Sequence, residues 1–153
     1  MAILEIITHP DPRLYKVSNK VTDFSYVCSN LVPDVYETMI SADGIGIAAT
    51  QVGINQSFFV IDLQGPTDVC MVFINPIITK LSEAKSTMLE GCLSLPGVEA
   101  NIERPSSVHV TFFDCSEIKY TLEADGLLSK CIQHETDHLL GITMHNYTIG
   151  IED

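Results

Sequence analysis

The chain has 153 residues, and its 8 basic and 20 acidic residues give a formal net charge of −12 at neutral pH. This negative charge argues against unaided binding to nucleic acid or anionic lipid. Hydrophobic residues make up 46% of the chain and charged residues 18%, which is typical of a globular protein rather than a disordered one. We predict one domain over residues 1–153. The sequence shows neither a membrane-spanning apolar run nor a signal-peptide pattern, so we expect a cytoplasmic protein.

The first half of the chain predicts two helical segments followed by strands. Residues 9–14 indicate a turn and a short helix, with Asp11 as its cap and Pro12 at its first position. A helical period extends from residue 24 to about 42, and Pro33 predicts a kink or a late start. The glycines in residues 44–53 indicate a strand or extended loop that another group approaches closely. Residues 57–63 and 69–76 are apolar, β-branched runs that predict a buried hairpin.

The second half of the chain predicts further strands and one late helix. Residues 77–81 and 85–89 are weaker strand candidates, and residues 108–113 and 118–123 indicate a hairpin. Residues 125–141 predict a helix with Asp125 as its N-cap and Gly141 just beyond its end. His9, His109 and His145 have no ligand-like neighbours, so we expect them to be packed or surface histidines. The fold class is therefore α+β, with mostly antiparallel β-sheets packed around a central helix.

The five cysteines are odd in number and widely scattered, a pattern that predicts no disulfide framework and fits a reducing compartment. We expect four of them to be small buried apolar residues. Cys92 differs because it lies in a loop between Gly91 and the turn at Pro96 and Gly97.

The late helix carries the motif His134-Glu135-x-x-His138, a histidine pair four residues apart. With helical spacing, Leu127, Cys131 and the two histidines form one stripe, and a single metal ion can reach both imidazoles. Glu135 is turned by about 100° from His134, where a general base for metal-bound water belongs. A charged helix with a chance histidine pair explains these letters equally well.

A catalytic metal site needs a third protein ligand and an open position. Cys92 is the best supplier, because a thiolate and two neutral imidazoles make a tetrahedral site with water at the fourth corner. A loop cysteine is, however, more often simply buried.

Three separated segments resemble the signature motifs of the peptide deformylase family: residues 44–51, residues 90–94 and residues 133–138. The resemblance covers nearly the whole chain and implies that Cys92, His134 and His138 bind one divalent metal ion. It also implies that Glu135 is the general base. Gln51 and the backbone N–H of Leu93 would stabilise the oxyanion.

The resemblance implies a metal-dependent hydrolase that removes the formyl group from the N-terminal formylmethionine of new polypeptides. Fe²⁺ is the expected native metal, and Zn²⁺, Ni²⁺ or Co²⁺ could substitute. The peptide would lie along Ile45 and Gly46 as an added strand. Ile45, Leu127 and Cys131 are the candidates for the methionine pocket. An ion pair between Arg104 and Asp137 would orient the ligand helix.

The sequence departs from the family pattern in several places. Thr136 replaces a usually apolar residue, and Glu99 stands where many members carry arginine. Lys130 lies beside the expected methionine pocket, and its stem can pack while its amine reaches water. Residues 149–153 predict no helix, so the C-terminal helix into which many bacterial members of the family continue is not expected here. A docking role of that helix, for instance at the ribosome, is not carried over to this chain. We expect at most transient ribosome proximity and no binding to nucleic acid or membrane.

Two other functions fit parts of the pattern. A zinc metallopeptidase shares the histidine motif but generally takes its third ligand from His, Glu or Asp. A structural metal module would fill the fourth position with a side chain, for which Cys131 is the nearby candidate.

Overall fold

The computed structural model describes residues 2–148. Its helical elements are η1 (Pro12–Tyr15), α1 (Phe24–Tyr26), η2 (Val27–Leu31), α2 (Val32–Ser41), η3 (Ala49–Val52), α3 (Gly126–Leu139) and α4 (Met144–Thr148). Its strands are β1 (Gly46–Ala48), β2 (Phe58–Ile61), β3 (Met71–Leu81), β4 (Lys85–Cys92), β5 (Leu95–Pro105), β6 (Ser107–Phe113) and β7 (Lys119–Asp125). Within residues 2–148, no helix is long and apolar enough to cross a bilayer.

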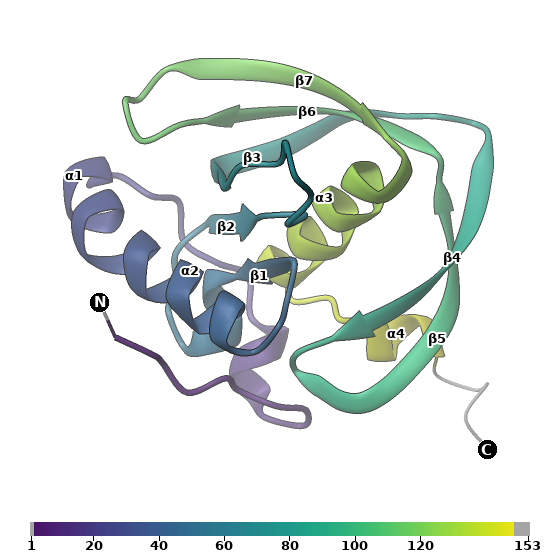
Figure 1. Cartoon of the computed structure of the whole chain (residues 1–153), viewed down its shortest axis with the longest axis horizontal. Helices are drawn as coiled ribbons and strands as arrows, with labels where there is room; N and C mark the ends of the chain where they lie inside the picture. The colour runs from purple at the N-terminus through teal and green to yellow at the C-terminus, as the bar shows by residue number, and fades with distance from the viewer. Residues whose placement is uncertain (1, 149–153) are drawn as a thin grey trace.

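The strands form an antiparallel five-stranded sheet in the order β1-β2-β3-β6-β7 and a separate β4–β5 hairpin. Helix α3 lies between this curved sheet and the hairpin (Figure 1). Its residues Cys131, Ile132 and Leu139 share one apolar core with the sheet. The predicted α+β class, with antiparallel sheets around a central helix, is confirmed.

The position of strand β2 in the fold explains why its sequence is apolar at every position rather than at alternate positions. Phe59 and Ile61 point into the core shared with α3, while Phe58 and Val60 pack into a second core that contains Met39 of α2. Because both faces of the strand are covered, all four of its residues are completely buried. The sheet therefore holds α2 on one side and α3 on the other.

The N-terminal predictions hold with one refinement. The Asp11 carboxylate accepts a hydrogen bond from the Arg13 N–H at 2.9 Å and caps η1 as expected. Pro33 lies in the first turn of α2, directly after the π-helical turn η2. The irregularity expected at Pro33 is therefore a widened turn before a regular helix.

Two strand predictions differ from the structure. Residues 69–76 and 77–81 belong largely to one strand, β3, whose register shifts between Ile74 and Ile77. Asn75 lies at this shift with φ of +52°. The eleven-residue strand β5 was not predicted, although it pairs along the whole of β4. This pairing ends with Cys92 opposite Leu95, which places the cysteine at the tip of the hairpin, beside α3.

The predicted ends of α3 are confirmed. Asp125 occupies the N-cap position, although its side chain makes no capping hydrogen bond. At the other end, Gly141 has φ of +78°, and its N–H donates to the His138 carbonyl at 3.1 Å. A Cβ atom at Gly141 would lie 2.7 Å from the Tyr15 carbonyl oxygen, so glycine is also needed for space. Leu127 is 42% exposed, and the buried stripe therefore begins at Cys131.

The cysteine predictions need correction. Cys28 and Cys115 form a disulfide, although they are 87 positions apart in the sequence. Cys70 is exposed rather than buried, and Cys131 alone of the four is a buried free thiol as expected. The helix α4 was also not predicted, and the prediction for residues 149–153 lies outside the described residues.

Candidate metal centre and active site

Three side chains from two elements converge beside the central helix. His134 and His138 lie one turn apart on α3, and their Nε2 atoms are 3.3 Å apart. Cys92 Sγ, at the end of β4, lies 3.3 Å from His138 Nε2. All three ligand atoms fall within 4.8 Å of one another. A tetrahedral ion with bonds of about 2.0–2.3 Å separates its ligands by roughly 3.3–3.7 Å, so this set fits one metal ion.

The charges around His134 also favour a cation at this point. Burial alone would lower the pKa of His134, but the neighbouring Glu135, Cys92 and Glu90 outweigh it and raise the pKa to about 10. Without metal, the imidazole of His134 therefore holds a proton at neutral pH. A metal ion bound by the same nitrogen would replace that proton, as metal binding by histidine requires.

A buried ionic network supports His134 from behind. Its Nδ1 donates to Glu90 Oε1 at 3.1 Å, and Arg104 donates to both oxygens of Glu90 at 2.7 and 3.1 Å. Burial would raise the pKa of Glu90, but the hydrogen bonds from His134 and Arg104 hold it below its usual value. Glu90 therefore stays ionised and directs the Nε2 atom of His134 towards the ligand set.

The network continues from Arg104 to Asp137, three residues after His134 on α3. Arg104 Nη1 donates to Asp137 Oδ2 at 2.9 Å, which is the contact expected from the sequence. Tyr147 on α4 donates its hydroxyl to the same Asp137 oxygen at 2.7 Å, and its ring lies 4.7 Å from the guanidinium carbon. Neither Glu90 nor Tyr147 was predicted. The sequence could have indicated Glu90, since it lies two positions before the candidate ligand Cys92, whereas nothing in the sequence points to Tyr147.

Glu135, the next residue on α3, lacks such partners among the described residues. It is 4% exposed, and its Oε1 atom receives no hydrogen bond from the described residues. Burial raises the pKa of this carboxyl to about 7. A Cβ atom at Gly46 would lie 2.8 Å from Glu135 Oε2, so the bare backbone of β1 makes room for the carboxylate. A buried carboxyl that titrates near neutrality is suited to proton transfer.

Gln51 presents its amide to the same place from η3. Its Oε1 accepts the Ala48 N–H at 2.9 Å, which fixes the orientation of the amide. Its Nε2 donates to Ser94 Oγ at 3.0 Å and lies 3.7 Å from Cys92 Sγ. The Nε2 atom of Gln51 therefore lies at the edge of the ligand set, next to Cys92.

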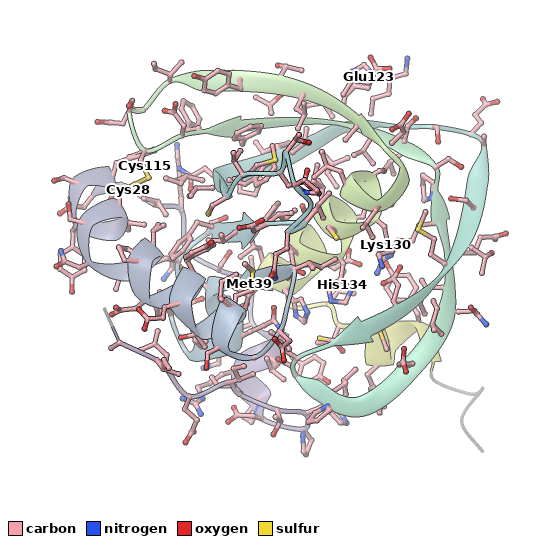
Figure 2. All side chains as sticks on the ribbon, in the orientation of Figure 1. Cys28, Met39, Cys115, Glu123, Lys130 and His134 are labelled. Atoms are coloured by element: carbon pink, nitrogen blue, oxygen red, sulfur yellow. A yellow bond between two sulfur atoms is a disulfide. The ribbon has the colours of Figure 1, made fainter. Side chains whose placement is uncertain are left out.

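A cavity of about 600 Å³ opens from this centre. Its wall includes the predicted substrate-binding residues Ile45, Gly46 and Cys131, together with Leu93. Leu127 does not line it. Two of the residues that depart from the family pattern, Lys130 and Glu99, also line this cavity. Figure 2 shows Lys130 close to His134, between α3 and the β4–β5 hairpin.

The geometry also bears on the alternative of a structural metal module. Within residues 2–148, the metal-capable group contains Cys92, His134 and His138 but not Cys131. Burial raises the pKa of the Cys131 thiol to about 12, which disfavours the thiolate that a metal ligand needs. Among the described residues, Cys131 therefore does not join the three ligands.

Comparison with known proteins agrees with this geometry. The family model described as polypeptide deformylase matches residues 3–152. Peptide deformylase 1 of Ralstonia nicotianae is 45% identical over 147 residues, which are 96% of this chain and 87% of that protein. Peptide deformylase 1 of Pseudomonas syringae pv. tomato is also 45% identical, over 99% of this chain and 90% of its own length.

Solved structures show the same similarity. A probable peptide deformylase from Synechococcus phage S-SSM7 has a TM-score of 0.90 and 38% identity, with 94% of this chain and 99% of that chain covered. The peptide deformylase of Thermotoga maritima has a TM-score of 0.91 and 33% identity, with 96% and 98% covered. The chain thus belongs to the polypeptide deformylase family, metal-dependent hydrolases that remove the formyl group from new polypeptides.

Proposed function

We propose that this chain deformylates N-formylmethionyl peptides with one metal ion held by Cys92, His134 and His138. The observation that carries the proposal is the convergence of these three ligand atoms beside the buried carboxyl of Glu135, whose Oε1 atom has no hydrogen-bond partner among the described residues. We propose Fe²⁺ as the native metal. The same sulfur and nitrogen ligands would accept Zn²⁺, Ni²⁺ or Co²⁺.

Glu135 is the proposed general base. When bound, the metal ion would lower the pKa of a water molecule and polarise the formyl carbonyl. The Glu135 carboxylate accepts the proton that this water loses, at an oxygen that no described protein group occupies. It then transfers the proton to the departing amine, and the products are formate and a free α-amino group. A pKa of about 7 suits both steps at neutral pH.

The negative charge that develops on the formyl oxygen needs hydrogen-bond donors. We assign this role to Gln51 Nε2 and to the backbone N–H of Leu93. The Gln51 amide is already held in place by the Ala48 N–H. Each well-aimed donor in such a site contributes roughly 3 kcal/mol to transition-state stability.

The peptide is proposed to bind along β1. This strand lies at the edge of the five-stranded sheet, so it can pair with an added strand, and Gly46 keeps its backbone accessible. The methionine side chain would enter the cavity near Ile45 and Cys131, both of which line it. Leu127 is left out of this pocket because it does not line the cavity.

We further propose a cytoplasmic location, where nascent chains leaving the ribosome supply the substrate. The net charge of −12 opposes unaided binding to nucleic acid or anionic membranes. Formylated peptides are therefore the proposed partners.

Anaerobic formate release from a formyl-Met tripeptide tests the proposal. Iron-loaded parent protein should release formate, and Glu135→Ala should lower the rate at least about 100-fold. Glu123→Ala is the matched control, because Glu123 is an exposed glutamate on β7, far from His134 (Figure 2). Absence of release by folded, iron-loaded parent would overturn the proposal. Cleavage of internal bonds in unformylated peptides would favour a metallopeptidase instead.

A further inference from the structure

The disulfide joins two elements at the end of the molecule away from the metal ligands (Figure 2). Cys28 belongs to the π-helical turn η2, and Cys115 lies in the turn between β6 and β7, with their Cα atoms 5.8 Å apart. The Phe24 and Phe113 rings also meet here, with centroids 6.0 Å apart. The crosslink therefore fastens the N-terminal helical segment to the edge hairpin of the sheet.

This pair differs from the other three cysteines. Cys92 and Cys131 line the active-site cavity, and Cys70 is exposed without a cysteine partner among the described residues. Cys115 is exposed in its turn, and Cys28 is half-buried beside it. Small thiols and disulfides can therefore reach the Cys115 sulfur without any opening of the core.

We propose that Cys28 and Cys115 form a reversible thiol–disulfide switch that controls how firmly residues 24–41 are held on the sheet. The bond would close by exchange with a low-molecular-weight disulfide, such as oxidised glutathione. The first step forms a mixed disulfide at Cys115 and releases one small thiol. The Cys28 thiolate then attacks the Cys115 sulfur and displaces the second small thiol, so two electrons pass to the small disulfide.

The switch is expected to act on stability and not on the metal ligands. Its effect would be carried by η2 and α2, which form one continuous helical run that ends near Met39. A Cβ atom at Gly44 would lie 2.9 Å from Leu93 Cδ1 and 3.3 Å from Met39 Cγ, so this end of the run borders the cavity. His134, His138 and Cys92 lie on α3 and β4 and are not part of the run.

Thiol counting and thermal unfolding of zinc-loaded protein test the switch, whatever the outcome of the deformylase assay. After treatment with oxidised glutathione, denatured and chelated parent should expose three alkylatable thiols, and after dithiothreitol all five. The oxidised form should unfold roughly 5–15 °C above the reduced form, because the crosslink closes a long loop in the unfolded chain. Zinc content should be the same in both.

Three variants complete the test. Cys28→Ser and Cys115→Ser should each unfold like the reduced parent and lose the response to dithiothreitol. Cys70→Ser, which changes another exposed cysteine, should keep the response to dithiothreitol. Five alkylatable thiols after oxidation, or equal unfolding temperatures of oxidised and reduced parent, would overturn the proposal. The thiol count of the parent tests the proposal even if one of the variants fails to fold.

Discussion

The polar groups around the metal ligands form two sets that differ in how their hydrogen bonds are satisfied. Behind His134, Glu90 and Arg104 are almost fully buried, and each makes several short contacts. On the cavity side, Glu135 is equally buried, yet its Oε1 atom has no protein partner among the described residues. The two carboxyls respond in opposite ways, since the pKa of Glu90 is lowered and that of Glu135 is raised to about 7.

This difference separates positioning from reactivity. A carboxylate whose oxygens are occupied by Arg104 and His134 cannot exchange protons readily, but it can orient a metal ligand. A carboxyl that burial keeps near its titration point can accept and release a proton within one turnover. Mutations of Glu90 or Arg104 should therefore change stability and metal affinity, and mutations of Glu135 should change the rate of the chemical step.

The largest effect on stability is expected from Arg104→Ala. It leaves Glu90 buried without its bidentate partner, which should lower the free energy of unfolding by about 3–5 kcal/mol. Loss of this support for His134 should also weaken metal binding roughly 10–100-fold. Denaturant unfolding of the metal-free protein and competitive metal titration measure the two effects.

Arg13→Ala is the matched control for this change. Arg13 pairs with Asp11 at 2.8 Å, but its side chain is 55% exposed. Exposed pairs contribute little to stability, so this variant should unfold like the parent. Unchanged metal affinity in Arg104→Ala would show that the network does not position His134.

A pH-dependent effect is expected from Glu135→Gln in the metal-free protein. Between the ordinary pKa of 4.5 and the raised value of about 7, folded Glu135 holds a proton that the unfolded chain has lost. Parent stability should therefore fall as pH rises through this window, by about 3 kcal/mol in total. The glutamine variant should lack this fall, so its advantage should grow from about pH 4 to pH 8 in urea unfolding. A constant difference across this range would contradict the raised pKa.

The smallest effect is expected from Tyr147→Phe. The variant loses the hydroxyl's hydrogen bond to Asp137 and the one it accepts from Arg104 Nη1 at 3.2 Å, but it keeps the ring beside Arg104. Since Tyr147 is 39% exposed, water can replace both lost hydrogen bonds, and the cost should stay below about 1 kcal/mol. Metal affinity should change less than about threefold if Arg104 and Glu90 do most of the positioning. A loss as large as that in Arg104→Ala would place Tyr147 among the essential positioning residues.

Local spacing alone predicts only part of the site, and the family resemblance supplied Cys92, Gln51 and the Arg104–Asp137 pair. The histidine pair follows from helical periodicity, and Gly141 follows from the left-handed turn after the helix. The end of β4 brings Cys92 to these histidines through a register that no local pattern reveals. Tyr147 reaches Asp137 because α4 turns back towards α3, which depends on packing rather than on sequence period.

The difference between local pattern and tertiary packing also explains the errors in the predicted fold. Strand β5 was missed because Pro96 and Gly97 were interpreted as a loop, although Glu99 and Glu103 belong to an alternation of exposed and inward residues that is typical of a half-buried strand. Its pairing with β4 covers only one side, so it lacks the continuous apolar pattern of β2. The disulfide was missed because cysteine spacing does not tell which pairs meet when 87 positions separate them.

The most direct test of the three-ligand metal centre is the absorption spectrum of the Co²⁺-loaded protein. We predict a thiolate-to-cobalt band from one thiolate in the parent, unchanged in Cys131→Ser and Glu135→Gln. Cys92→Ser should lose the band. A band that survives in Cys92→Ser, or that weakens in Cys131→Ser, would contradict the assignment of Cys92, His134 and His138 as the metal ligands.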